Sequence, residues 1–182
     1  AVKVDTSHNK VILQDDSEVN FDYLIVAAGA RHSYFGNDDW EESAPGLKTV
    51  EDALEIRRRV LLAFELAEKE AILTGEHESL NFVVVGGGAT GVELAGAIAG
   101  IARVALAKDF HAIDTKSARV MLYEGADRIL NSFSPSLSER AKQDLEKLGV
   151  EVHLNSFVTD ICPGEVKVGD MSYELSVMSY EL

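Results

Sequence analysis

The spacing of hydrophobic residues changes along the chain, and it divides the N-terminal part into three segments. Apolar and polar residues alternate over 2–13, which predicts two short strands around a turn at residues 8–9. A continuous apolar run at 22–30 predicts a buried strand that leads into a glycine turn. Turn formers and acids fill residues 31–47 and predict a long surface loop.

A helical pattern begins near Val50, where apolar residues start to recur every three or four positions. Thr49 is a good N-cap residue, and Asp52 stands three positions further on as its partner in a capping box. Residues 74–79, TGEHES, are expected to end the helix. The residues predicted to face the core are Ala53, Leu54, Val60, Leu61, Phe64 and Ala67. The residues predicted to face water are Arg57, Arg58, Glu65, Glu68 and Lys69.

From residue 81 onward, strand and helix patterns alternate. This order is typical of a parallel sheet with helices on its faces, because parallel neighbours need a crossover connection. Gly149 stands where a glycine commonly stops a helix. The predicted elements are strand 81–85, helix 92–107, strand 118–124, helix 136–149 and strand 150–154.

The tail of the chain, residues 157–182, has a different pattern. Pro163–Gly164 and Gly169–Asp170 are expected to form turns between antiparallel strands. The pentapeptide MSYEL occurs twice in this tail, and it is too short to be a structural repeat. The sequence thus predicts an α/β fold, with a Rossmann-like parallel sheet, flanking helices and an antiparallel β segment.

Three glycines form a G-x-G-x-x-G pattern directly after the strand at 81–85 and at the start of the following helix. The first glycine allows a tight turn, the second lets a pyrophosphate approach the backbone, and the third lets helix and strand pack closely. The N–H groups at the helix start then hold the phosphates. The predicted dinucleotide-binding residues are Gly86, Gly87, Gly88, Ala89, Thr90 and Gly91. The alternative is a purely structural turn.

An acid at the end of the second parallel strand is the usual companion of such a loop, because its carboxylate accepts hydrogen bonds from the adenosine ribose hydroxyls. Glu124 has this position, but it follows Gly91 by 33 residues (124 − 91) instead of the ~20 expected. We assign the excess to residues 101–118. An anion here repels the 2′-phosphate of NADP, so NAD is the expected cofactor, although Arg128 could weaken this preference. The alternative is a surface acid at a strand end.

The composition excludes several other functions. With a net charge of −14, the acidic surface repels nucleic acid, so no such partner is expected. The single cysteine, Cys162, rules out a disulfide framework and fits a reducing, cytoplasmic compartment. Arg103 interrupts the most apolar stretch, which is too short to span a membrane. No metal site is expected, because the histidines lie far apart: His8, His32, His77, His111 and His153.

Five stretches of the sequence, taken in order, resemble the bacterial type II NADH:quinone oxidoreductases, single-subunit NADH dehydrogenases of the pyridine nucleotide-disulfide oxidoreductase superfamily. The stretches are FDYLIVAAGARHSYFG, APGLKTVEDALEIRRRVLLAFELAE, VVVGGGATGVELAGAIA, IDTKSARVMLYEGADRIL and LSERAKQDLEKLGVEV. The likeness covers nearly all of residues 1–168. In that family an FAD-binding domain is interrupted by an NADH-binding domain, and a hydride passes from NADH to flavin and then to a membrane quinone.

The resemblance implies roles for individual residues. Glu93 matches a family glutamate near the nicotinamide and the flavin, and it is the implied catalytic residue. Ala28 and Gly29 match a stretch whose backbone passes close to FAD. The family usually has threonine in place of Ala28 and often proline in place of Ala89. The residues implied to bind NADH are Gly86, Gly88, Gly91 and Glu124.

The resemblance also implies a division into domains. Residues 1–47 are expected to be part of an FAD-binding domain, and residues 48–182 an NADH-binding domain with its core at 81–168. The family's N-terminal FAD glycine motif, its late FAD motif, its quinone-site glutamines and its membrane anchor have no counterpart in this sequence. The chain is therefore expected to be an internal fragment that binds NADH, lacks tightly held FAD and is inactive alone.

For the full-length parent, the resemblance implies quinone as the partner and a peripheral place on the cytoplasmic face of the inner membrane, through parts absent here. A homodimer is possible. Two alternatives stay open: another FAD/NAD(P)-dependent reductase of the superfamily, and a nucleotide-binding module without catalysis. FAD at the glycine loop is disfavoured, because FAD loops of such proteins lie near the chain start, whereas this loop follows the 22–30 segment by about sixty residues.

Overall fold

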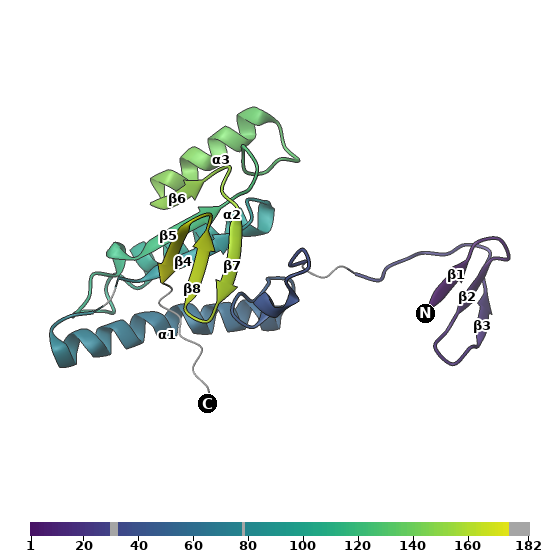
Figure 1. The fold of residues 1–182 in the computed structure, drawn as a ribbon, viewed down its shortest axis with the longest axis horizontal. Coiled ribbons are helices and arrows are strands. Elements are labelled where there is room, and N and C mark those ends of the chain that lie inside the picture. The colour runs from purple at the N-terminus through teal and green to yellow at the C-terminus, as the bar shows by residue number, and fades with distance from the viewer. Residues whose placement is uncertain (30–32, 78, 175–182) are drawn as a thin grey trace. The chain divides into compact units, whose positions relative to one another are not determined.

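The computed structural model describes residues 1–29, 33–77 and 79–174, which fall into two compact units, Ala1–Arg31 and His32–Leu182 (Figure 1). The second copy of MSYEL lies outside the described residues. The boundary between an FAD-binding and an NADH-binding domain near residue 47 stays a prediction.

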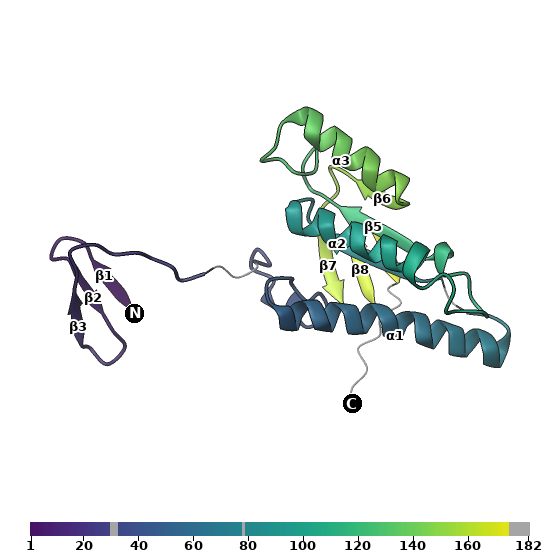
Figure 2. The same ribbon diagram turned by 180° about the vertical axis from the view of Figure 1, so that it is seen from behind.

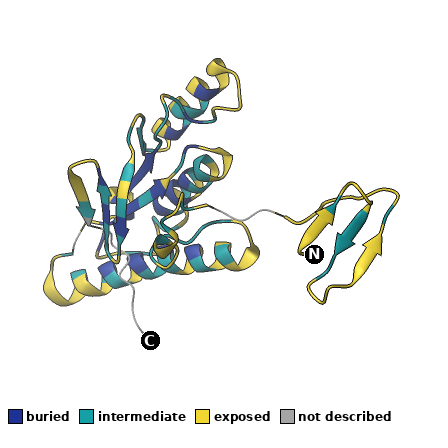
Figure 3. Ribbon diagram, turned by 45° about the vertical axis from the view of Figure 1, so that its right-hand side comes forward, coloured by how far each residue is buried: buried dark blue, intermediate teal, exposed yellow. Residues whose placement is uncertain are grey.

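The first unit contains one small antiparallel sheet. Its strands are β1 (Lys3–Asp5), β2 (Lys10–Ile12) and β3 (Glu18–Asn20), and β2 lies in the middle. Sequence patterning predicted the first two strands and their turn, where Asn9 has a φ of 52°, but it missed β3. None of the described residues 1–29 is buried (Figure 3). A sheet of this size, with no covering layer of its own, leaves both faces in contact with water.

The predicted buried strand at 22–30 was wrong for the residues that the structure describes. Residues 22–29 form no strand, and Tyr23, Ile25 and Val26 are 94%, 89% and 74% exposed. An apolar run reveals a tendency to be buried, but a strand also needs a neighbouring backbone to pair with. The described part of the chain supplies no strand that pairs with this segment.

The loop that precedes the first long helix is more ordered than predicted. It contains the short 3₁₀ helix η1 (Asp38–Glu41), and Trp40 packs against a hydrophobic cluster of the second unit. The Tyr34 hydroxyl donates a hydrogen bond of 2.7 Å to the Ala44 carbonyl and closes the loop on itself. Part of the loop therefore covers this hydrophobic cluster.

The long helix α1 (Val50–Thr74) begins and ends as its sequence predicts. The Asp52 N–H donates to Thr49 Oγ1 at 3.2 Å, and the Thr49 N–H donates to Asp52 Oδ2 at 2.8 Å, which completes the capping box. Gly75 ends the helix with a φ of 82°. The predicted inner residues Val60, Phe64 and Ala67 are buried, whereas Ala53 and Leu54 are exposed. Ile56 takes a core position that the prediction missed.

A parallel sheet lies at the centre of the second unit. Its strands are parallel, as the alternating pattern predicted, and they run in the order β4-β5-β6. The second helix begins earlier than predicted, at Ala89, and becomes a π-helical turn from Ile101. The elements are β4 (Asn81–Val85), α2 (Ala89–Gly100), η2 (Ile101–Ala105), η3 (Thr115–Ser117), β5 (Arg119–Tyr123), α3 (Pro135–Lys147) and β6 (Val150–His153).

Three layers cover one another in this unit. In Figure 1, β7 and β8 lie in front of the parallel sheet. In Figure 2, which shows the opposite side, α2 lies in front of it. The antiparallel sheet consists of β7 (Val158–Cys162), β8 (Glu165–Val168) and β9 (Met171–Glu174), with the predicted turns between them. The expected α/β fold is confirmed. Helices on both faces were expected, but α1, α2 and α3 contribute to the core on one face, and the antiparallel sheet covers the other.

The alternation of side chains along β4 and β5 explains this layering. The residues directed to the helices are Phe82, Val84, Val120 and Leu122. Those directed to the antiparallel sheet are Val83, Met121 and Tyr123. Both faces of the parallel strands are apolar, so each needs a cover. The Phe64 ring of α1 lies 5.5 Å from the Phe82 ring and anchors the helical layer.

Glu68 on α1 was expected to face water, but its carboxylate holds a connection between two other elements. It accepts hydrogen bonds of 2.9–3.0 Å from the N–H groups of His111, Ala112 and Ile113, which lie between η2 and η3. These backbone donors, His111 first, lower the pKa of Glu68 below its ordinary value. The ionised carboxylate thus stabilises a loop that has no regular secondary structure.

Glu68→Gln should make the protein less stable at neutral pH and remove part of its sensitivity to acid. Because the folded-state pKa lies below the unfolded one, the contribution of Glu68 is present above the unfolded pKa and is lost as the pH falls through the folded value. Thermal unfolding at pH 7, 5 and 3 should show a difference between the variant and the wild type that shrinks toward acid. Glu65→Gln, an exposed acid of the same helix, is the control. A difference in melting temperature that stays constant with pH would contradict this account.

Candidate nucleotide-binding site

Backbone conformation and close packing restrict side chains in the glycine loop between β4 and α2. Gly86 has a φ of 103°, which favours glycine. A Cβ on Gly91 would lie 1.9 Å from the Gly86 carbonyl oxygen, so the start of α2 rests directly on the backbone that leaves β4. These two glycines have the turn and packing roles that the sequence pattern predicts.

The middle glycines differ from each other. A Cβ on Gly87 would lie 2.8 Å from Ile129 Cγ2 and 2.9 Å from Glu124 Oε2, so this position is also restricted. The motif did not predict that restriction. A Cβ on Gly88 would meet no atom within 4 Å, and Gly88 is exposed. Gly88 therefore faces the open space in which a phosphate could approach the backbone.

The start of α2 lacks the side-chain cap that α1 has. Gly88 is its N-cap residue, and no side chain of the described residues caps this helix end. Ala89 and Thr90, the first helical residues, are exposed. The N–H groups of a first helical turn have no partner within the helix, and they carry the positive end of its dipole. This end of α2 is therefore suited to bind an anion.

Glu124 lies directly after β5 and joins that strand end to the glycine loop. Its Oε2 accepts a hydrogen bond of 2.6 Å from the Gly87 N–H, and its Oε1 accepts one of 2.7 Å from the Ala126 N–H. The large sequence distance between acid and loop has a structural cause, since η2, η3 and their connection occupy the extra residues at 101–118. The parallel pairing of β4 with β5 brings the acid to the loop in spite of that insertion.

Backbone hydrogen bonds hold the loops after β5 and β6 together. The Glu124 N–H donates to the His153 carbonyl at 2.9 Å, the Ser156 N–H to the Glu124 carbonyl at 3.0 Å, and the Asn155 N–H to the Ala126 carbonyl at 2.9 Å. On the other side, the Leu130 N–H donates to the Gly87 carbonyl at 2.7 Å. The carboxylate thus lies in a frame built from three loops at one edge of the sheet.

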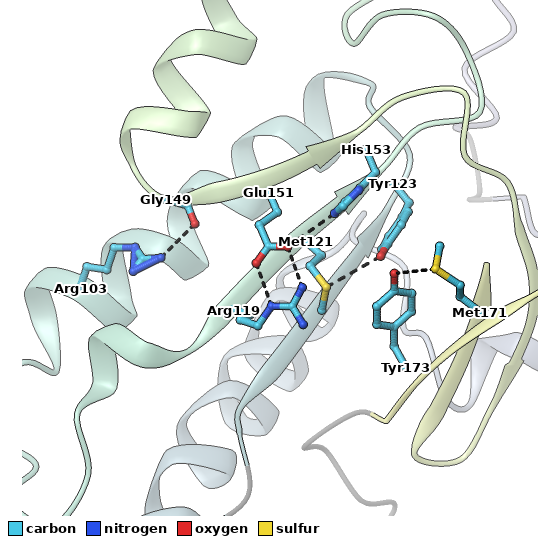
Figure 4. Close-up of polar contacts among 9 residues, drawn as sticks. All are labelled: Arg103, Arg119, Met121, Tyr123, Gly149, Glu151, His153, Met171 and Tyr173. Atoms are coloured by element: carbon cyan, nitrogen blue, oxygen red, sulfur yellow. Dashed lines mark hydrogen bonds and ion pairs between the residues drawn. The ribbon is translucent and has the colours of Figure 1, made fainter. Parts of the chain in front are cut away.

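An aromatic and ionic cluster lies on β5 and β6, the two strands that lead into this frame (Figure 4). The ring of Tyr123, which precedes Glu124, stacks on the His153 ring at 4.6 Å and an interplanar angle of 12°. Arg119 donates two hydrogen bonds, of 2.8 and 2.7 Å, to Glu151, and this pairing holds the pKa of Glu151 below its ordinary value. Burial raises the pKa of the Tyr123 hydroxyl, so the phenol stays neutral. Sequence reasoning missed this cluster because its members are joined only by strand pairing.

Arg103 joins η2 to the chain that follows α3 (Figure 4). Its guanidinium donates to the carbonyls of Leu148, Lys116 and Gly149 at 2.7, 2.9 and 2.9 Å. Gly149 has a φ of 84°, and a Cβ there would lie 2.4 Å from the guanidinium. One cation therefore ties the π-helical turn η2 to the end of α3.

The remaining predicted residues make other contacts or are exposed. Glu93 is exposed on α2, and Gly29 has a φ of 73° in the first unit. Arg128 donates hydrogen bonds to the Asn131 side chain and carbonyl, at 3.0 and 3.1 Å. Among the described residues, no group of His, Cys, Asp and Glu is arranged to hold a metal ion. No described helix combines the length and apolar character needed to cross a bilayer.

The family model for pyridine nucleotide-disulphide oxidoreductases matches residues 1–178, and the chain belongs to this family. Over 150 residues it is 47% identical to the type II NADH:quinone oxidoreductase Ndh of Mycobacterium tuberculosis, a match that covers 82% of this chain and 32% of Ndh. NdhA of the same organism is 48% identical over 141 residues, covering 78% of this chain and 30% of NdhA. The chain thus spans about a third of the length of these relatives.

A solved structure supports the fold. NDH2 from Plasmodium falciparum, determined in complex with NADH, superposes with a TM-score of 0.72 over 93% of this chain and 36% of that one. The sequence identity of 23% limits this likeness to the fold. The two proteins therefore share the Rossmann-like arrangement of strands and helices although their sequences differ at most positions.

Gly91→Ala and Gly88→Ala should have opposite effects. The Cβ added at position 91 would meet a backbone oxygen that cannot move without displacing β4 or α2, so we expect a loss of about 2 kcal/mol or more in the free energy of unfolding. The Gly88 substitution meets open space and should cost less than about 1 kcal/mol. Urea denaturation measures both. Equal losses would show that the close approach at Gly91 does not control the loop.

Proposed function

We propose that this chain is the NADH-binding portion of an FAD-dependent NADH dehydrogenase that passes a hydride from NADH to flavin and then to quinone. The observation that carries the proposal is the meeting of the uncapped start of α2 with the Glu124 carboxylate, at the carboxyl ends of β4 and β5. Identities of 47% and 48% to the two mycobacterial quinone oxidoreductases support it. Hydride transfer and quinone reduction are proposed for a longer protein that contains this chain.

We propose that the start of α2 and Glu124 bind different parts of the nucleotide. The pyrophosphate is proposed to lie at Gly88, Ala89 and Thr90, where exposed N–H groups meet the positive end of the helix dipole. The adenosine ribose hydroxyls are proposed to donate to Glu124, because an ionised carboxylate has about four acceptor positions and two are used by backbone N–H groups. A 2′-phosphate would be repelled there, which favours NADH over NADPH.

Glu93 is the proposed catalytic residue, and its position is compatible with contact to a ligand. It is exposed on α2, close in sequence to the phosphate-binding turn. NADH supplies the hydride in this chemistry. The family resemblance of the TGVE stretch supports a place for Glu93 near the nicotinamide.

FAD fits the described residues less completely than NADH does. Ala28 and Gly29 are the proposed contacts to FAD, and both are exposed. The described part of the first unit contains no helix whose start could hold a second pyrophosphate. We therefore propose that flavin binding requires protein outside the described residues.

Quinone is the proposed final electron acceptor, because the mycobacterial relatives are quinone oxidoreductases by name. A peripheral position on the cytoplasmic face of the inner membrane and a homodimer are proposed for the longer protein on family resemblance. The alternative to an NADH dehydrogenase is a nucleotide-binding module without catalysis. When joined to a complete FAD domain, such a module would bind NADH but would not reduce the flavin.

Glu124→Gln should reduce the preference of the chain for NADH. The wild type is expected to bind NADH at least about tenfold more tightly than NADPH, because a hydrogen bond to a charged acceptor contributes about 1.5–3 kcal/mol. The variant keeps one acceptor oxygen but loses the charge, so the ratio of the two dissociation constants should fall toward one. Calorimetric titration with both cofactors measures it, with Glu139→Gln on α3 as the control. Equal binding of the two cofactors before and after the change would refute the role of Glu124.

Glu93→Gln should impair chemistry while leaving the fold intact. In a longer protein that contains this chain and holds flavin, the rate of flavin reduction by NADH should fall about 10²-fold, the lower end for a positioned acid or base. The melting temperature should stay within a few degrees, because the side chain is exposed. Stopped-flow absorbance and thermal unfolding report the two effects, and Glu70→Gln on α1 is a matched exposed control. A large loss of stability with normal flavin reduction would assign Glu93 a structural role only.

A further inference from the structure

An exposed aromatic ring lies beside the loop that carries Glu124. Phe157 is 70% exposed and directly precedes β7. Its ring covers Gly125: a Cβ on Gly125 would lie 2.4 Å from Phe157 Cε1 and 2.9 Å from Cδ1 and Cζ. The ring thus packs on the backbone of the residue that directly follows Glu124, while most of its surface faces water.

The position of Phe157 relative to Glu124 is fixed by the backbone. Ser156, its neighbour, donates to the Glu124 carbonyl at 3.0 Å, and Asn155 donates to the Ala126 carbonyl at 2.9 Å. On its other side, β7 begins at Val158. The ring is therefore held on the same loop frame as the carboxylate, and glycine at position 125 allows the close contact.

The charges around Phe157 indicate which part of a dinucleotide fits there. Glu124 and the exposed Asp127 place negative charge in the loop, and the guanidinium of Arg128 donates to Asn131, so the loop disfavours a phosphate. The phosphates have a better position at the start of α2, where N–H donors are exposed. The neutral base is attached to C1′, next to the carbon that bears the 2′-hydroxyl. A ribose held by Glu124 therefore brings its base close to that carboxylate and to the ring beside it.

We propose that Phe157 is a base-contacting residue that stacks on the adenine of the bound dinucleotide. This inference rests on the function proposed above, in which Glu124 holds the adenosine ribose. Stacking of a nucleobase on an aromatic side chain typically contributes about five- to a hundredfold in affinity, judged from alanine substitutions. Part of the Phe157 ring already lies against Gly125, so the lower part of this range applies.

The test is a titration of the chain with three ligands that differ in their nucleotide halves. NADH and ADP-ribose contain adenosine, whereas reduced nicotinamide mononucleotide does not. Phe157→Ala should weaken NADH and ADP-ribose binding about five- to tenfold and leave binding of the mononucleotide unchanged. Phe157→Tyr keeps the ring and should restore the affinity. Phe35→Ala, which removes another exposed ring of the same unit (92% exposed), is the control and should change nothing.

A second variant displaces the ring without removing it. Gly125→Ala places a methyl group where the Phe157 ring lies, and the exposed ring can swing away at little cost in stability. It should weaken ADP-ribose about as much as Phe157→Ala does. If the wild type binds ADP-ribose but both variants bind it equally well, the role of Phe157 is refuted and the proposed function stands. If the wild type binds neither NADH nor ADP-ribose, the proposed function itself fails.

Discussion

The contact between the start of α2 and the end of β4 governs the whole candidate site. With no side chain at Gly91, the helix lies so close to the strand that a Cβ would be 1.9 Å from the Gly86 carbonyl oxygen. This approach orients the Gly87 N–H toward the neighbouring strand end, where Glu124 accepts it. It also leaves the N–H groups after Gly88 exposed to a ligand. A helix held further away could not serve both purposes, because the loop would then turn from the sheet edge.

Much of this arrangement could be predicted from the sequence, because local rules determine it. The capping box at Thr49, the terminating glycine at position 75 and the alternation of strand and helix after residue 81 each depend on short-range geometry. The place of Glu124 at the end of the second parallel strand could also be predicted, although the sequence distance was unusual, but its hydrogen bond with the Gly87 N–H could not. Parallel strands place their carboxyl ends at one edge, so the insertion at 101–118 changed the spacing without moving the acid.

Other features could not be predicted, since they depend on which surfaces meet. The apolar run at 22–29 indicates a need for burial but not the strand that would satisfy it. Trp40 lies in a segment with a loop-like composition, yet it packs against the hydrophobic cluster between the parallel and antiparallel sheets. The stack of Tyr123 on His153 joins residues thirty positions apart (153 − 123) through strand register alone. Such contacts become visible only when the topology is known.

The connection between η2 and β5 is held by two side chains of opposite charge, and acid should release only one of them. Glu68 holds residues 111–113 through its carboxylate, which loses this function when protonated. Arg103 holds the carbonyl of Lys116 through a guanidinium that keeps its charge in proteins. As the pH falls, the first half of the connection can therefore open locally, while its second half stays attached through Arg103. Within this connection, protonation of Glu68 therefore releases residues 111–113 and leaves the attachment at Lys116 in place.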